Sequence, residues 1–432
     1  RVLRINIRVR ARFLMKRGVR QRVSLRIGKT LLVDGPATVQ VIEGMVNVMG
    51  AVFAEGSILK VRRFRRMPFY AEHSDADLLI DGKKYQIIEG STIPVSWIDC
   101  AEKTVGDEAR LIAIVGGTDS GKTSLATFLV NYYLNFQGEV GIVDGDPGQN
   151  DLGIPGTVSA GVANKSLSDL CQVKPEVIEF IGLTAPETVA GELNESIAKI
   201  IDRLVKRGVR KIVLNTDGWV SPKGLKHKAE LMKMVKPYFV VSLLGEEDSA
   251  LFAKEINQNM KVIRVEAPLY VKKRSRAQRK LLRMLNYKKH FAKSRFVKVS
   301  VSEVRFVNHP FINGEPTFLS EKVGEGLEIV EAKLYMGKTY VKTRGVLDEP
   351  VFIEAGGRSI ILLGEGWERG LLVGLARGDA FLGVGVIESL TDKEVTVRTP
   401  LSSRFDSIKL GEIKLDPVFN EKSFHWKPRS ID

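Results

Sequence analysis

The segment LIAIVGGTDSGKT (111–123) decides the fold that this chain is expected to adopt. Its first five residues are all apolar, as in a strand that is buried on both faces of a parallel sheet. Residues 116–123 then match the pattern G-x-x-x-x-G-K-[ST], a glycine-rich loop that turns its backbone N–H groups toward phosphate oxygens. A helix that begins near Lys122 would add the positive end of its dipole. Strand, loop and helix together predict a nucleotide-binding α/β domain.

The polar side chains of this loop have distinct chemical tasks. Lys122 would neutralise the β- and γ-phosphates of a nucleotide, and the Thr123 hydroxyl would hold Mg²⁺. The glycines permit the tight turn that brings the backbone close to the phosphates. The predicted nucleotide site comprises Gly116, Gly117, Thr118, Asp119, Ser120, Gly121, Lys122, Thr123 and Ser124.

Apolar runs and helical periodicity alternate along the centre of the chain. Such alternation is typical of a doubly wound, mainly parallel sheet. We therefore predict an α/β P-loop domain over 106–300, between two other domains. Its expected strands are 111–117, 140–144, 211–215, 238–244 and 261–267, and its expected helices are 122–136, 187–207 and about 248–258.

Both flanks of this domain look β-rich. In 1–105, short alternating runs, the first at 2–8, are separated by Gly, Pro and turn signals such as Asp34-Gly35, and no helical periodicity is visible. This pattern predicts a small sandwich or barrel. In 301–432, apolar runs between Gly-rich turns predict a third, β-rich domain.

Basic residues are concentrated in three short segments. The 432 residues hold 66 Lys plus Arg against 51 Asp plus Glu, a net charge of +15. Segments 1–33, 60–66 and 272–298 carry 11, 5 and 12 basic residues and no acidic residue. Clustered cations release counterions from a nucleic-acid backbone, which would explain the pattern. A merely basic soluble surface, as in heat-adapted proteins, would explain it equally well.

Cysteine content and hydropathy indicate the cellular compartment in which the protein is expected. Cys100 and Cys171 are too few for a disulfide framework or a CxxC-type zinc site. No run of about 18 apolar residues predicts a spanning helix, and the Arg-rich N-terminus lacks the apolar core of a signal peptide. We therefore expect a cytoplasmic protein without a membrane partner. The five histidines show no metal-ligand spacing, and we expect them on the surface or satisfied in the core.

A second polar motif, DGDPGQ (144–149), follows the next apolar strand. A carboxylate at this end of a strand, next to the phosphate loop, either joins the Mg²⁺ shell or activates the nucleophile. A polar turn that merely closes the strand would leave the same pattern. Spacing alone does not decide between Asp144 and Asp146.

No guanine-binding motif accompanies the loop. Asn164-Lys165 begins like N-K-x-D, but the fourth residue is Leu167, and the segment 215–217 lacks the spacer before its acid. A standard GTPase is therefore disfavoured, and we expect either ATP as the nucleotide or a relaxed nucleotide preference.

Two further motifs would serve an acceptor and a transferring phosphoryl group. TDGW (216–219) follows a predicted strand, where Trp219 would stack on a base or, alternatively, pack into the core. KKRSRAQR (272–279) precedes a helical stretch. Arginines on such a segment can close over a phosphoryl group and neutralise its charge, whereas a solvated basic helix is the simpler interpretation.

Taken in chain order, four motifs resemble one family, the polynucleotide 5′-hydroxyl kinases of the eukaryotic pre-mRNA cleavage complex and of ribosomal-RNA processing, with their archaeal relatives. The resemblance covers the central domain, and the β-rich flanks are compatible with that family's three-domain layout. The motifs are the loop at 116–123, D-x-D-x-G-Q at 144–149 with I-P-G-T at 154–157, T-x-G-W at 216–219 and R-S-x-x-x-R at 274–279.

The resemblance implies a role for each motif. Asp146 would be the base that takes the proton of the attacking hydroxyl, and two arginines would lie on a lid, 268–290, over the γ-phosphate. The implied catalytic residues are Lys122, Asp146, Arg274 and Arg279. The implied acceptor site is Thr184, Thr216, Gly218, Trp219 and Gln149, and the implied metal ligands are Thr123, Asp144 and Asp146.

The implied function is an ATP-dependent polyribonucleotide 5′-hydroxyl-kinase, which transfers the γ-phosphate of ATP to the 5′-hydroxyl end of RNA. ATP and Mg²⁺ are the implied cofactors, while DNA as a second acceptor and protein partners stay open. The alternative is an ATP-holding assembly factor of an RNA-processing complex. It would lack Lys122, Asp146 or the lid arginines, all of which are present. A GTPase or a metal-chaperone-like NTPase would need a guanine reader or paired Cys/His ligands, which are missing.

Overall fold

The computed structural model of this chain describes residues 20–427, except 107, 109, 257–259, 320–326, 346 and 356. The described residues divide into an N-terminal unit, 20–48 with 52–92, and a main unit, 49–51 with 93–427. The strand expected at 2–8 and residues 1–19 of the first basic segment lie outside the described residues. The P-loop segment lies within the main unit.

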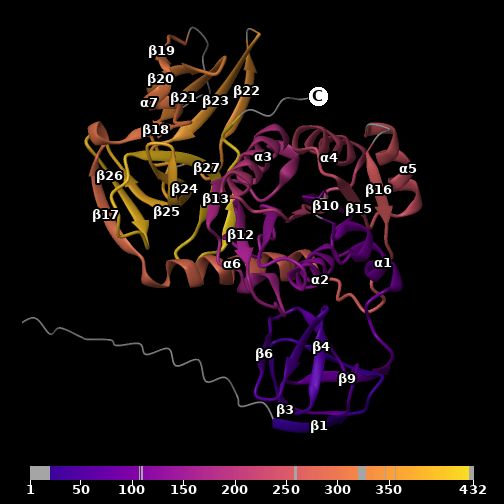
Figure 1. Cartoon of the computed structure of the whole chain (residues 1–432). Helices are drawn as coiled ribbons and strands as arrows, with labels where there is room; N and C mark the ends of the chain where they lie inside the picture. The colour runs from indigo at the N-terminus through magenta and orange to yellow at the C-terminus, as the bar shows by residue number, and fades with distance from the viewer. Residues whose placement is uncertain are drawn as a thin grey trace, which may run out of the picture. The chain divides into compact units, whose positions relative to one another are not determined.

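The N-terminal unit is built from strands alone (Figure 1). They are β1 (Arg20–Leu25), β2 (Lys29–Asp34), β3 (Ala37–Glu43), β4 (Met45–Val48), β5 (Ala51–Ala54), β6 (Ile58–Val61), β7 (Arg66–Tyr70), β8 (Ala76–Asp81) and β9 (Lys84–Glu89). Two sheets form, with strand orders β1-β8-β3-β6 and β5-β4-β7-β2-β9. Alternate residues of β3, namely Ala37, Val39 and Val41, are buried, as a strand with one wet face requires. The expectation of a β-rich N-terminal region is confirmed.

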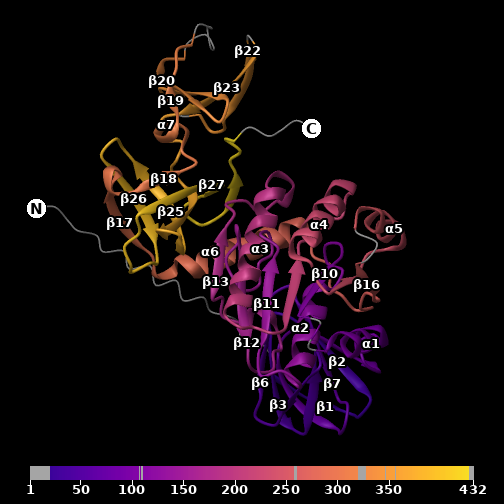
Figure 2. The same ribbon diagram turned by 45° about the horizontal axis from the view of Figure 1, so that its top comes forward.

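A seven-stranded, mainly parallel sheet forms the centre of the main unit (Figure 2). Its strands are β10 (Leu111–Val115), β11 (Val140–Gly145), β12 (Thr157–Ala163), β13 (Val177–Phe180), β14 (Ile212–Thr216), β15 (Phe239–Ser242) and β16 (Lys261–Arg264). The order is β13-β12-β11-β14-β10-β15-β16. The strands from β11 to β16 in this order run parallel, and β12 and β13 add an antiparallel edge. The predicted fold class, a doubly wound P-loop domain with β-rich flanks, is confirmed.

Helices pack against both faces of this sheet because its central strands are apolar throughout. The helices on these faces are α1 (Val95–Thr104), α2 (Lys122–Leu134), α3 (Ala190–Lys206), α4 (Pro222–Val235) and α5 (Glu246–Glu255). Two further helices, α6 (Arg276–His290) and α7 (Pro310–Asn313), pack instead against strands of the C-terminal part of the chain. Ile112 of β10 belongs to one core cluster with Leu125 of α2. Its neighbour Ala113 belongs to the opposite cluster with Leu193 of α3 and Leu225 of α4. Successive residues of a strand face opposite sides, which explains the two cores.

One helix contradicts the expectation that 1–105 contains none. α1 buries Trp97, Cys100 and Thr104 at the spacing of one helix face. Trp97 Nε1 also donates to the carbonyl oxygen of Glu266 at 2.9 Å, inside the main unit. The ten residues of α1 span fewer than three helical turns. An apolar pattern that repeats over so few turns is hard to distinguish from the pattern of a loop.

The rest of the main unit is β-rich, as the predicted fold class requires. Its strands are β17 (Arg295–Ser300), β18 (Arg305–Val307), β19 (Glu315–Pro316), β20 (Ile329–Tyr335), β21 (Lys338–Thr343), β22 (Val351–Ala355), β23 (Arg358–Gly364), β24 (Leu371–Arg377), β25 (Ala380–Leu390), β26 (Glu394–Thr399), β27 (Ser407–Leu415) and β28 (Glu421–Ser423). One sheet has the order β17-β26-β25-β24-β27-β18, with β28 beside β27, and the other has the order β19-β20-β21-β23-β22. We call this part, 295–427, the C-terminal region.

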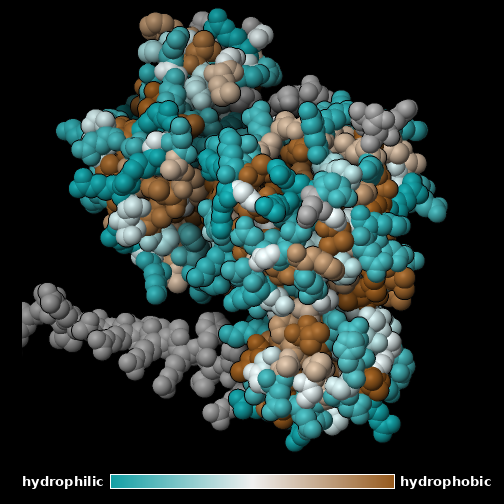
Figure 3. Space-filling view, viewed as in Figure 1, coloured by the Kyte–Doolittle hydropathy of each residue, from teal (hydrophilic) through white to brown (hydrophobic). Residues whose placement is uncertain are grey.

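The visible face of each unit is mostly hydrophilic, with apolar residues scattered among polar ones (Figure 3). Over the described residues, no helix combines the length and the apolar character that crossing a membrane requires.

Truncating the core of the central sheet should destabilise the main unit. Leu214 of β14 is fully buried. Leu214→Ala is expected to lower the free energy of unfolding by about 2–5 kcal/mol, because it removes apolar contacts and leaves a cavity. Urea unfolding measures the change. Leu251→Ala, at an exposed position of α5, is the matched control and should cost under about 0.5 kcal/mol. An equal loss in both variants would contradict the core position of Leu214.

Candidate active site

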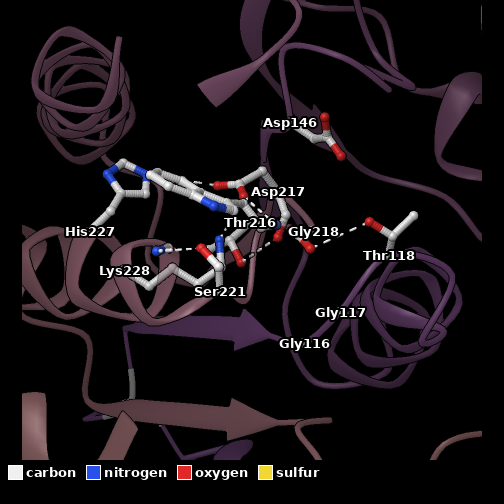
Figure 4. A network of polar contacts seen from close by, with 12 residues as sticks. Gly116, Gly117, Thr118, Asp146, Thr216, Asp217, Gly218, Ser221, His227 and Lys228 are labelled. Atoms are coloured by element: carbon white, nitrogen blue, oxygen red, sulfur yellow. Dashed lines mark hydrogen bonds and ion pairs between the residues drawn. The ribbon is translucent and has the colours of Figure 1, made fainter. Parts of the chain in front are cut away.

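Three segments that carry the predicted site residues meet at one edge of the seven-stranded sheet. β14 lies between β10 and β11, and all three strands are parallel. The carboxyl ends of parallel strands lie at the same edge of a sheet. The P-loop (116–123) follows β10, the DPGQ turn (146–149) follows β11, and the TDGW turn (216–219) follows β14. Figure 4 shows the three segments side by side.

The P-loop has the backbone of a phosphate cradle. Gly121 lies at φ +101° and Asp119 at φ +56°, in the left-handed region that a tight inward turn requires. A Cβ atom on Gly116 would lie 2.7 Å from Ser120 Oγ and 2.9 Å from Leu243 Cβ, so a larger residue would crowd the loop. α2 begins at the loop without a side-chain N-cap, which leaves its first N–H groups available to an anion.

The Lys122 side chain lies back along the P-loop. Its ammonium donates to the carbonyl oxygens of Gly116 and Gly117 at 2.8 and 2.7 Å. Burial lowers the pKa of Lys122 to about 8, although the charge of Asp146 opposes that change. Charged phosphate oxygens are stronger acceptors than carbonyls, so this ammonium is placed to exchange its partners for a phosphate group.

The two acids after β11 differ in how they use their oxygens. Asp144 is fully buried, and its Oδ2 accepts from the Asp151 N–H at 2.7 Å while its Oδ1 accepts from a side-chain amide of β14. Asp146 uses Oδ1, which accepts from the N–H groups of Gly148 and Gln149, both at 2.9 Å. Among the described residues, no group donates to Asp146 Oδ2. Asp146 therefore keeps an oxygen available, and Asp144 does not.

Burial raises the pKa of both carboxyl groups. For Asp144 burial is the main cause, and the charge of Asp151 adds to it. For Asp146 burial again leads and the charge of Asp217 adds to it, while Lys122 opposes both. A carboxylate whose pKa is raised binds a proton more readily. Asp146 thus combines an available oxygen with increased basicity.

A buried ion pair holds the TDGW turn. Asp217 Oδ1 accepts from Lys228 Nζ of α4 at 2.7 Å and from the Trp219 N–H at 2.8 Å (Figure 4). The Asp217 and Lys228 side chains are 3% and 0% exposed, so water does not screen the pair. Burial alone would raise the pKa of Asp217, but Lys228 and the surrounding hydrogen bonds hold this pKa below its usual range. The carboxylate therefore stays charged and fixes the backbone at Trp219.

The P-loop and the TDGW turn touch directly. Thr118 Oγ1 donates to the carbonyl oxygen of Gly218 at 3.3 Å. A Cβ atom on Gly218 would lie 2.4 Å from the same hydroxyl oxygen, so the close approach depends on glycine. Thr216 Oγ1 donates to the carbonyl oxygen of Ile114 in β10 at 2.8 Å. These contacts hold the half-buried Trp219 beside the phosphate site.

His227 corrects the expectation that each histidine is exposed or satisfied in the core. The residue is buried, and both of its ring nitrogens lack a hydrogen-bond partner among the described residues. Its Nε2 lies 3.8 Å from Asp217 Oδ2, beyond hydrogen-bond distance. The ring lies against Trp219, with centroids 5.6 Å apart and planes tilted by 33°. The His227 ring is therefore held by packing, and it packs against the indole of Trp219 in the TDGW turn.

Two arginines bind the P-loop from the segment before α6 and from its first turn. The Asp119 carboxylate accepts from the N–H, Nε and Nη2 of Arg274 at 2.9, 3.0 and 2.8 Å, and from Arg279 Nη1 at 3.2 Å. Arg274 Nη1 also donates to Gln149 Oε1 in the DPGQ turn at 3.2 Å. Burial alone would raise the pKa of Asp119, but the bonds to Arg274 lower it below its usual range. Both guanidinium groups therefore lie at the phosphate site.

Comparison with known proteins finds a family model that matches the part of the chain holding this arrangement. The family model described as the mRNA cleavage and polyadenylation factor CLP1 P-loop matches residues 116–293. That range contains the P-loop, both turns and the two arginines. Residues 116–293 of the chain are therefore similar to the CLP1 P-loop family. The predicted resemblance is confirmed over this region.

Relatives of this CLP1-type domain share most of their length with the chain. A polyribonucleotide 5′-hydroxyl-kinase of Methanocaldococcus jannaschii is 28% identical over 324 residues, which is 71% of this chain and 87% of the relative. A protein of the same activity name from Thermococcus kodakarensis is 28% identical over 314 residues, 70% of this chain and 88% of the relative. A solved chain of a Clp1p–Pcf11p complex matches with a TM-score of 0.64 at 16% identity, over 91% of this chain and 98% of that chain. The last likeness shows a shared fold.

The CLP1-type P-loop fits a nucleotide phosphate. Inside it, Ser120 Oγ is buried without a hydrogen-bond partner among the described residues, and a phosphate oxygen would supply one. Across the described residues, no group of three or more His, Cys, Asp or Glu side chains is arranged to hold a metal ion. Mg²⁺ in phosphate sites commonly takes one or two protein ligands and completes its shell with phosphates and waters. The half-buried Thr123 and Asp146 fit that requirement.

The structure also shows contacts that sequence reasoning missed. Lys228 does not belong to any of the sequence motifs. Its ion pair with Asp217 depends on how helix α4 packs after the TDGW turn. Asp119 is predicted to bind nucleotide, yet its carboxylate binds the arginines. The carbonyl oxygen of Thr184 would lie 2.7 Å from a Cβ atom on Gly148, which places Thr184 beside the DPGQ turn.

Removing one charge of the buried pair should be more damaging than removing both. Lys228→Met leaves the Asp217 carboxylate buried and unpaired, and is expected to lower the free energy of unfolding by about 3–5 kcal/mol. The double variant Asp217→Asn/Lys228→Met keeps an acceptor for the Trp219 N–H and should recover most of that loss. Urea unfolding of the three proteins measures both effects. A single variant as stable as the wild type would show that the pair does not hold the turn.

Proposed function

We propose that this chain is an ATP-dependent polyribonucleotide 5′-hydroxyl-kinase, which transfers the γ-phosphate of ATP to the 5′-hydroxyl end of RNA. One observation carries the proposal: Asp146, with its available Oδ2, lies in a turn that Arg274 joins to the P-loop. A proton acceptor, a phosphate cradle and cations are thereby combined, and phosphoryl transfer to a hydroxyl needs these parts. The activity names of the curated relatives support the same function.

Proton removal is assigned to Asp146. Its Oδ2 would accept the proton of the 5′-hydroxyl group as that oxygen attacks the γ-phosphorus. The N–H bonds from Gly148 and Gln149 hold the other oxygen, so the carboxylate keeps one orientation. Burial raises the pKa of Asp146 and favours proton uptake.

Charge on the transferring phosphoryl group would be neutralised from two sides. Lys122 would bind the β- and γ-phosphates from the P-loop, and Arg274 and Arg279 would bind the γ-phosphate from the lid. Both arginines already lie at the P-loop, bound to Asp119. Mg²⁺, when bound, withdraws negative charge from the phosphate oxygens, and Thr123 with Asp146 would hold it.

The RNA end is assigned to the surroundings of the TDGW turn. Trp219 would stack on the terminal base, and any base offers such a face, so weak sequence preference is expected. The proposed acceptor site consists of Thr184, Thr216, Gly218, Trp219 and Gln149. The acid-free segment 272–298, with exposed Lys273, Arg276 and Lys280, would attract the phosphates that follow.

The proposed layout places catalysis in 106–300, with a lid at 268–290, between β-rich domains at 1–105 and 301–432. ATP is proposed as the donor because no guanine-binding motif accompanies the P-loop. We propose a cytoplasmic location, and leave DNA as a second acceptor to the experiment. The alternative, an ATP-holding assembly factor, predicts ATP binding without transfer.

Label transfer from γ-labelled ATP tests the proposed activity. With Mg²⁺, the wild-type chain should label a 5′-hydroxyl RNA but not its 5′-phosphorylated control, and a matched DNA measures acceptor choice. Lys122→Ala should lower transfer by at least about 10³-fold, because the phosphates lose their main counter-charge. Asp146→Asn should lower kcat by about 10²–10⁴-fold and leave ATP binding nearly intact.

Two results of this assay would contradict parts of the proposal. ATP binding by the wild type without label on any acceptor would favour the assembly factor. Asp144→Asn is the matched control for the base, because it changes the neighbouring acid whose oxygens are already engaged. A larger loss of kcat in Asp144→Asn than in Asp146→Asn would show that the wrong acid was assigned.

Trp219→Ala should separate the two substrates. Loss of one stacked base costs about 1–3 kcal/mol, so the KM for RNA should rise roughly 5- to 100-fold while the KM for ATP stays within about twofold. Steady-state kinetics with each substrate varied in turn measures the effect. Trp97→Phe, a change at a buried residue of α1, controls for general destabilisation. An unchanged KM for RNA in Trp219→Ala would assign Trp219 to packing alone.

A further inference from the structure

Helix α6 runs from the candidate active site to the C-terminal region (Figures 1 and 2). At its beginning, the Ser275 hydroxyl accepts from the Gln278 N–H at 3.1 Å and caps the helix. Arg274 lies just before this cap, and Arg279 lies in the first turn. Both bind Asp119 of the P-loop. The position of the Arg279 guanidinium group therefore depends on where α6 is held.

The apolar face of α6 is buried in the C-terminal region. Tyr287 is fully buried in a core cluster with Leu372 of β24 and Ile413 of β27. The ring of Phe291, directly after the helix, stacks on Phe419, with centroids 5.4 Å apart and planes within 7°. These aromatic contacts attach the second half of α6 to the C-terminal region.

A largely buried ion pair extends this attachment toward the active site. Arg283 Nε lies 2.8 Å from both carboxylate oxygens of Glu421 in β28, and Arg283 Nη2 binds Glu421 Oε1 as well. The two side chains are 16% and 11% exposed, so screening by water is weak. A planar guanidinium that binds one carboxylate through two nitrogens has a fixed orientation.

The anchor and the active-site contact are one helical turn apart. Residues four apart lie on the same side of a helix, separated by about 6 Å along its axis. α6 is continuous from Arg279 to Arg283. A shift of Arg283 would therefore move Arg279 with it. The segment of α6 from Arg279 to Arg283 is thus held at one end by the ion pair with Asp119 and at the other end by the ion pair with Glu421.

A second contact joins the same helix to the segment after the DPGQ turn. Tyr287 Oη donates to the carbonyl oxygen of Pro155 at 3.2 Å. The next residue, Gly156, donates its N–H to the carbonyl oxygen of Pro147 inside the turn at 2.9 Å. A Cβ atom on Gly156 would lie 3.2 Å from Ile413 Cδ1. The C-terminal region therefore borders both the lid and the loop that carries Asp146.

We propose that Glu421 is a positioning residue for phosphoryl transfer: by holding Arg283, it places the lid arginine Arg279 at the phosphate site. The inference rests on the proposed function and deepens it, because it gives the C-terminal region a task in the reaction. Among the described residues, Glu421 has no hydrogen bond or ion pair with the P-loop or with either turn, so it would act through α6. Its loss should lower turnover and leave the binding of both substrates unchanged.

The test compares two variants of the full chain that each remove one carboxylate charge from a contact with the C-terminal region. Glu421→Gln weakens the pair on α6. Glu192→Gln weakens the pair between α3 and Lys409 of β27, which joins the same region to the P-loop domain away from the lid. The second variant is the matched control, since it alters the same kind of contact without altering the hold on α6.

Kinetics should separate positioning from stability. Glu421→Gln is expected to lower kcat by about 5- to 20-fold, with both KM values within about twofold, because small displacements of reacting groups cost turnover. Glu192→Gln should change none of these values by more than about twofold. In an Arg279→Ala background, Glu421→Gln should change kcat by less than about twofold, because its effect passes through Arg279. Fully additive losses, or equal losses in the control, would overturn the proposal.

Hydrogen exchange tests the anchor without any measurement of activity. Glu421→Gln should speed exchange of α6 amides by at least about fivefold relative to α3, and Glu192→Gln should not. The reversed pair Arg283→Glu/Glu421→Arg should restore slow exchange and turnover together. If the wild-type chain transfers no phosphate, the proposed function is wrong. Hydrogen exchange alone then tests whether Glu421 anchors α6. Unchanged exchange in α6 of Glu421→Gln would then overturn it.

Discussion

The parallel pairing of β14 between β10 and β11 is the constraint on which the candidate site depends. In this register Asn215 is the partner of both Ile114 and Asp144, so the three strands end together. The loops that follow therefore share one edge of the sheet. Helices α2 and α4 start at that edge, and Thr118 contacts Gly218 where the first and third loops meet. The proposed chemistry depends on this shared edge, because residues about a hundred positions apart have to act on one phosphate.

Buried ion pairs then determine how the loops lie at this edge. An uncompensated charge in the interior is costly, and the carboxylates of Asp217 and Asp119 are each paired with a cation. Asp217 also binds the N–H of Trp219, and Asp119 also binds the N–H of Arg274. Each pair thus holds a stretch of backbone as well as a side chain. These ion pairs therefore fix the positions of the residues that are proposed to contact a substrate, although the Asp217 and Lys228 side chains themselves are not proposed to contact it.

The fold and the loops were predictable because their signals are local. The apolar runs of β10 and β11 are buried on both faces, and the glycines of the P-loop occupy conformations that other residues avoid. Helix α1 was missed since it shows its period over fewer than three turns. The pair of Arg283 with Glu421 spans 138 residues, and no local pattern reports which helix packs on which strand.

The attachment of α6 constrains how a lid can work in this chain. In many enzymes a lid opens by the movement of a whole loop or domain, which lets the substrate enter. Here the apolar face of the helix is part of the C-terminal core, so swinging it would expose Tyr287 and Phe291 to water. Residues 265–275 before the helix have no regular structure, and Pro268 lies against Gly121 of the P-loop. In the proposed kinase, opening would come from this segment and from the arginine side chains, which would exchange Asp119 for phosphate while α6 stays in place.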